Sequence, residues 1–204
     1  MKPSRESPIS KIDTPGLGKS SNSQSSRTGR QKSAEAEIRV DPDDRKRASR
    51  RCQSTMSNTI SILNDLIETL KDGQRGFTES ARDIRNAELK ATLSGLATQR
   101  EQFAAQLQVL ARSFGEESPA NTGSLSGSLH RGWINLKAAL ASQDEHAILA
   151  ECERGEDVAV AAYRKALEGN ELPVAAAEIV RTQFAGIQAA HNQVKALRDA
   201  AVAH

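Results

Sequence analysis

Carboxylate and imidazole side chains recur in this sequence at spacings that bring them to one face of a helix. The candidates for binding a divalent metal are Glu68, Asp72, Glu101, Glu153, Glu156 and His191. A di-metal centre inside a helical bundle takes one glutamate from each of two helices and a Glu-x-x-His pair from each of the other two. The chain meets this pattern only in part, since Gln188 stands where the glutamate before His191 is needed. Likewise, Ala104 stands three residues after Glu101, where a histidine is needed. A full two-metal site and a single weak site built from Glu156, His191 and an acid of the first helix both stay open.

The position of Arg100 suggests a third interpretation of these residues, in which they form a buried charge network and bind no metal. It lies on the apolar stripe of its helix, between leucine and phenylalanine neighbours. An unpaired buried guanidinium costs several kcal/mol, so we expect it to pair with Glu156 or Asp72 through bidentate hydrogen bonds. His191 can donate to the same carboxylate. We therefore favour a buried polar layer of Asp72, Arg100, Glu156 and His191, which fixes the register of the helices and needs no cofactor.

Five helical segments are expected to position these residues. Apolar residues recur at every third or fourth place, which predicts helices over residues 57–84, 89–114, 129–141, 144–168 and 173–202. Asn86 marks a short turn between the first two, and Asp144 is a suitable N-cap for the fourth. Gly73, on the stripe of the first helix, is expected to allow close helix approach or to leave space for a polar group. Two short-linked pairs joined by a crossover of nearly thirty residues predict an all-α, ferritin-like four-helix bundle, with a short extra helix in the crossover.

The composition excludes several other classes of protein. Aromatic residues make up only 3% and alternating strand-like runs are missing, which favours an all-α fold. No run of 18 apolar residues exists, so no membrane span is predicted, and the N-terminus lacks the apolar region of a secretory signal. Cys52 and Cys152 do not form a disulfide framework, so a reducing cytoplasm is the expected location.

The first 55 residues differ from the rest in composition. Residues 1–56 carry 13 Lys and Arg against 7 Asp and Glu, whereas the remainder carries 15 against 19. We expect residues 1–55 to be a disordered basic tail and residues 56–204 to form the bundle. Because the folded part is mildly acidic, no specific nucleic-acid binding is expected. The basic tail could bind nucleic acid or anionic lipid weakly, and a solvated extension is the favoured interpretation. A further hypothesis is that translation begins at Met56 and that residues 1–55 are not translated.

Several motifs in order resemble one bacterial family. They are SILNDLIETLKDG at 61–73, GF at 76–77, LHRGW at 129–133, CERGED at 152–157 and HNQVKALRD at 191–199. Together they resemble the ferritin-like proteins catalogued as domain of unknown function 2383, over about residues 57–200. The resemblance implies a four-helix ferritin-like fold, a usual start near Met56 and an unassigned activity. The wider ferritin superfamily implies iron or manganese binding and oxidation, from which Arg100, Ala104 and Gln188 depart.

These observations together predict a function. We expect a non-catalytic ferritin-like bundle that serves as a stress-associated or protein-interaction module, with the buried polar layer in place of a di-metal centre. The alternative is binding or oxidation of iron or manganese at a degenerate site. A homodimer through the crossover helix is also predicted, while no protein partner can be named from the sequence.

Overall fold

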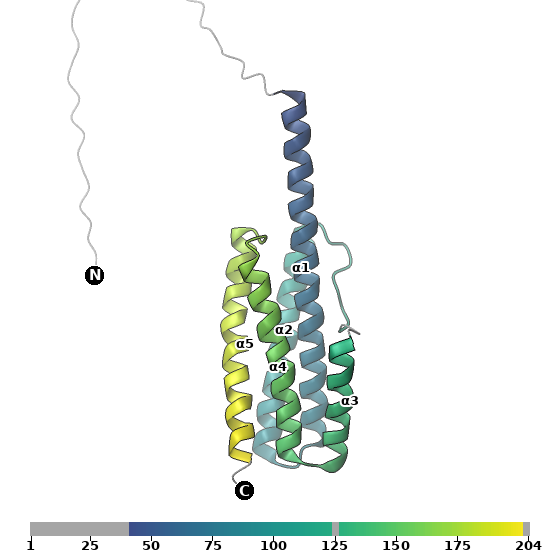
Figure 1. Ribbon diagram of the computed structural model, residues 1–204, viewed down its shortest axis with the longest axis vertical. Helices are drawn as coiled ribbons and strands as arrows, with labels where there is room; N and C mark the ends of the chain where they lie inside the picture. Colours follow the sequence, from purple (N-terminus) through teal and green to yellow (C-terminus); the bar gives the residue numbers. More distant parts are fainter. Residues whose placement is uncertain (1–40, 124–126, 202–204) are drawn as a thin grey trace, which may run out of the picture. The chain divides into compact units, whose positions relative to one another are not determined.

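The computed structural model describes residues 41–123 and 127–201, which form a bundle of long helices (Figure 1). The helices are α1 (Pro42–Asp83), α2 (Ala87–Ser113), α3 (Gly127–Ser142), α4 (Glu145–Glu168) and α5 (Val174–Ala201). Consecutive helices α1 and α2 pack against each other, as do α4 and α5, and α1 also packs against α4. The shorter α3 lies in the crossover and packs on α4 and α1. The predicted all-α bundle with one long crossover and a short extra helix is confirmed.

Side-chain caps fix where two of the long helices begin. The Asn86 side chain accepts hydrogen bonds from the backbone N–H groups of Glu88, at 3.0 Å, and Leu89, at 3.2 Å. Asp144 accepts from the backbone N–H of Ala147 at 3.1 Å and caps α4. Each cap satisfies backbone donors that have no partner within the helix. The cap predicted at Asp144 is confirmed, and Asn86 begins α2 two residues after the C-cap of α1.

The first helix begins much earlier than the sequence analysis predicted. It starts at Pro42 rather than Ser57, so the predicted boundary between residues 55 and 56 falls inside α1. The Asp41 side chain accepts a hydrogen bond from the backbone N–H of Asp43 at 2.8 Å, and Pro42 occupies the first helical position. Arginine, lysine and alanine then continue the helix by intrinsic propensity without burial. Residues 1–40 lie outside the described residues, so their disorder and the start at Met56 stay predictions.

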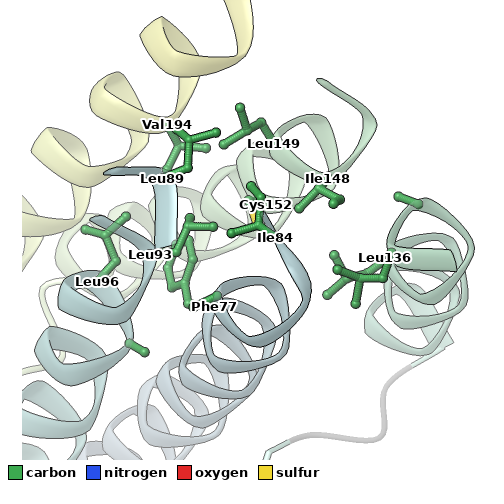
Figure 2. Packing of buried hydrophobic residues seen from close by; sticks show 14 of the residues in the cluster. Phe77, Ile84, Leu89, Leu93, Leu96, Leu136, Ile148, Leu149, Cys152 and Val194 are labelled. Carbon is green, nitrogen blue, oxygen red and sulfur yellow. The ribbon is translucent and has the colours of Figure 1, made fainter. Parts of the chain in front are cut away.

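Two apolar clusters form the core. One gathers residues from all five helices, and in Figure 2 the side chains of Phe77 and Ile84 lie beside Leu93 and Cys152. The other contains Leu63, Leu66, Leu70, Leu107, Tyr163, Val180 and Ile187 with their neighbours. Within the part of the chain that the structure describes, no helix has the length and apolar character needed to cross a membrane.

Candidate functional site

Arg100 and Glu156 form an ion pair inside the bundle. The Arg100 side chain is fully buried on α2, and Glu156, on α4, is 2% exposed. Arg100 Nη2 donates to Glu156 Oε2, and Nη1 donates to Gln99 Oε1 at 2.7 Å. The guanidinium carbon lies 5.8 Å from the centre of the Phe77 ring, within cation–π range. The pair therefore links α2 to α4 across the interior.

The electrostatics of this pair are those of two desolvated charges. Burial raises the pKa of the Glu156 carboxyl, and the Arg100 guanidinium offsets part of that increase. His191 also lowers the pKa of the Glu156 carboxyl, whereas Asp157 raises it. Arg100 Nε is buried and has no hydrogen-bond partner among the described residues. Removing either member of such a pair leaves a buried charge without compensation.

His191 was predicted to contact the carboxylate that binds Arg100, but in the structure it contacts Asp157 instead of Glu156. Its Nε2 lies 2.9 Å from Asp157 Oδ1, and its Nδ1 lies 3.3 Å from Asn192 Oδ1. The imidazole is 20% exposed, and the Asp157 side chain is 64% exposed. Asp157 is the next residue along α4 and points toward solvent, so His191 gains a partner there without complete desolvation. The prediction that His191 belongs to the buried layer is therefore wrong, because its partner is the exposed Asp157 and not Glu156.

Asp72 also lies outside the layer around Arg100. A Cβ atom built at Gly123 would come within 1.9 Å of Asp72 Oδ1, so this carboxylate faces the crossover segment. The side chain is only partly buried. Neighbouring residues on a helix point about 100° apart, and Gly73 is the residue that faces Arg100. Two adjacent residues of α1 thus face different neighbours: Gly73 faces the ion pair, and Asp72 faces the crossover segment.

The remaining metal candidates lie in different surroundings. Glu101 is exposed and lines an open groove of about 390 Å³ between α1 and α2. Glu153 pairs with Arg198 of α5, and Glu68 is partly buried one turn before Asp72. Within residues 41–123 and 127–201, no three acidic, histidine or cysteine side chains converge in a way that could hold a metal ion.

The donor set is therefore a poor fit to a ferritin-like di-metal centre. Arg100 is buried in the interior, Gln188 is exposed, and within the described part of the chain no group of carboxylates converges on a common point. A second cation beside an arginine would be repelled, and the buried carboxylate of Glu156 is already paired.

A second buried polar cluster was missed by the sequence analysis. Tyr163 Oη donates to Gln183 Oε1 at 2.7 Å. Gln183 Nε2 in turn donates to the Phe103 carbonyl at 3.2 Å and to Gln106 Oε1 at 2.9 Å. Burial raises the pKa of the Tyr163 hydroxyl, which keeps it protonated as a donor. This cluster joins α4, α5 and α2, and its only sequence signal was a tyrosine on an apolar stripe.

Cys152 is a buried free cysteine. Burial raises the pKa of its thiol to about 12. The sulfur lies 3.3 Å from Ser80 Oγ, and that hydroxyl also contacts the Gly76 carbonyl at 2.9 Å. A thiol held neutral in this way is a small core residue and a poor nucleophile.

The fold is that of a ferritin-like four-helix bundle. The structure is similar to that of a mutant of Dps1 from Mycobacterium smegmatis, with a TM-score of 0.56 and 11% sequence identity, covering 71% of this chain and 97% of that chain. No curated protein sequence matches the chain. The family model described as "Domain of unknown function (DUF2383)" matches residues 58–169, which is more than half of the chain. The chain belongs to this family, as the motifs in its sequence predicted.

Proposed function

We propose that this protein is a non-catalytic ferritin-like bundle, a stress-associated or protein-interaction module in which the pair of Arg100 and Glu156 replaces a di-metal centre. One observation carries the proposal. A guanidinium that is 0% exposed lies in the middle of α2, and its partner is a carboxylate that is 2% exposed. The protein thus supplies its own cation at the interior position where relatives of this architecture bind metals.

The surrounding residues support the same proposal. His191 is hydrogen-bonded to Asp157, and Glu153 is paired with Arg198, so neither could bind a metal without losing its present partner. The tyrosine and glutamine cluster adds a second polar link between helices. Two buried polar links of this kind specify helix register, which is the best-supported role of polar groups in a helical core.

Elemental analysis tests the proposal directly. The chain is purified without an affinity tag, incubated with Fe(II) or Mn(II), desalted and analysed by mass spectrometry, and its thermal unfolding is followed with and without a chelator. We expect metal well below one ion per chain and an unchanged midpoint. Retention of about one or two ions, lost in His191→Ala but kept in His146→Ala, would instead establish the alternative of iron or manganese binding.

We also propose that the protein forms a homodimer through α3. Ile134 of α3 is 54% exposed, although α3 already packs on the bundle through Leu136 and Leu140. A large apolar side chain on an added helix is a natural contact point between copies. Sedimentation equilibrium should give twice the chain mass, and Ile134→Asp should give the monomer. A monomeric unmodified protein would contradict this part of the proposal.

A further inference from the structure

The N-terminal part of α1 is an exposed, positively charged helix that contributes nothing to the core. Residues 43–58 are all exposed, and among the described helices none lies beside them (Figure 1). We call residues 43–58 the basic arm. Its cations are Arg45, Lys46, Arg47, Arg50 and Arg51, and its anions are Asp43 and Asp44.

The positive charge of the basic arm is not neutralised by the rest of the bundle. Lys46 Nζ lies 3.9 Å from Asp43 Oδ1, with the two side chains 71% and 75% exposed, and a pair so exposed contributes little. None of the four arginines makes an ion pair within residues 41–123 and 127–201. The described part of the bundle therefore leaves these guanidinium groups available to a partner.

The helical period places four of these cations on one side, whereas Arg45, seven residues before Cys52, lies on the other side. Lys46 and Arg50 are four residues apart, as are Arg47 and Arg51, so they form two adjacent rows along the helix. The buried stripe of α1 continues into the arm on the other side, through Met56, Cys52 and Ala48. The basic rows thus point away from the side of α1 that meets the bundle.

We propose that the basic arm binds the phosphate backbone of nucleic acids without regard to base sequence. Arginine favours phosphate, because its planar fork can donate two hydrogen bonds to one phosphate group. A membrane surface is a less suitable partner. A helix that lies on lipid needs a broad apolar face with leucine or aromatic residues, and the arm has only Ala48, Cys52 and Met56. Phosphate binding by the arm does not depend on the interior ion pair.

The experiment measures the salt dependence of binding to DNA. The full chain is titrated into a fluorescently labelled 30-base-pair duplex of random sequence, and anisotropy is recorded from 50 to 200 mM NaCl. The arm variant carries Lys46→Gln, Arg47→Gln, Arg50→Gln and Arg51→Gln. Four lost phosphate contacts should make the slope of log K against log salt shallower by roughly 3.6. At 100 mM salt we expect the affinity to fall at least tenfold.

A matched variant distinguishes the arm from bulk charge. It removes the same four positive charges from exposed sites on α4 and α5, by substituting glutamine for Arg164, Lys165, Arg181 and Lys195. We expect this variant to bind DNA nearly as tightly as the unmodified chain. Circular dichroism should show that both variants keep their helices, since every substituted side chain is exposed.

Three outcomes would overturn the proposal. The first is an equal loss of affinity in the two variants, which would assign binding to net charge alone. The second is unchanged binding by the arm variant, which would assign it to residues 1–40. The third is tighter binding to phosphatidylserine-containing vesicles than to DNA at the same salt, which would make the arm a lipid-binding helix.

Discussion

Gly73 on α1 lies against the side chain of Arg100 on α2. A Cβ atom built at Gly73 would lie 3.6 Å from Arg100 Cδ and 3.7 Å from both Cγ and Nε. These are ordinary contact distances, so the absence of a side chain leaves room for the arginine stem next to the α1 backbone. The same contact explains why Arg100 Nε has no acceptor, because a glycine offers no side-chain oxygen there.

Substitution of Gly73 should therefore stabilise the protein when the new side chain is small. Alanine fits at contact distance and favours the helix by up to about 1 kcal/mol. Serine is the weaker helix former, but its hydroxyl can accept a hydrogen bond from Arg100 Nε, which contributes about 1 kcal/mol. We expect Gly73→Ser to raise the free energy of unfolding in urea at least as much as Gly73→Ala. Gly73→Leu should lower it, and a serine variant less stable than the alanine variant would count against this geometry.

Removal of the buried cation should destabilise the protein strongly. Arg100→Leu leaves the Glu156 carboxylate buried without a partner, which should cost about 3 kcal/mol or more. Arg100→Leu combined with Glu156→Leu removes both charges, so the double variant should recover much of that loss. Chemical unfolding of the two variants tests this order. A loss below about 1 kcal/mol in the single variant would mean that Glu156 is stabilised by something other than Arg100.

The ion pair shows what the sequence could and could not predict. Arg100 interrupts an apolar stripe, and a buried cation needs a buried anion, so the sequence predicted a pair with Glu156 or Asp72. The structure pairs it with Glu156. The partner of His191 was harder to predict, because Glu156 and Asp157 are adjacent in sequence. Their side chains differ only in direction, by the rotation of one residue along the helix. Asp72 was placed wrongly for the same reason, since Gly73 next to it faces the interior.

Elements that do not depend on burial were the least predictable. The spacing of apolar residues predicted the long helices, because core packing imposes that spacing. The lengths of the connections between them predicted the crossover. The first residues of α1 bury nothing, so their helix depends on an N-cap and on propensity alone. Gln183 was overlooked because a glutamine becomes a core residue only where partners on other helices meet it, and those partners are far apart in sequence.

The buried tyrosine should contribute through its hydroxyl group. Tyr163→Phe keeps the ring and its stacking on Phe184, whose centre lies 6.2 Å away, but leaves Gln183 Oε1 without its donor. An unsatisfied buried acceptor costs about 1–3 kcal/mol. We expect a loss in that range from denaturant unfolding. Phe184→Leu serves as a control that keeps the hydrogen bond, and an unaffected Tyr163→Phe variant would show that water replaces the lost donor.

Alkaline pH should weaken the fold through Cys152. The unfolded thiol ionises near 9.0, whereas burial raises the folded pKa to about 12, so between these values the native state keeps a proton that the unfolded state releases. Stability therefore falls as pH rises above about 9, by up to about 1.4 kcal/mol per pH unit from this group. The free energy of unfolding is measured at pH 8, 9 and 10 for the unmodified chain, Cys152→Ser and Cys52→Ser. Because Cys52 is exposed, its variant should follow the unmodified chain, while Cys152→Ser should lose less stability above pH 9. Parallel curves for all three proteins would mean that the interior around Ser80 opens far enough for the native thiol to ionise.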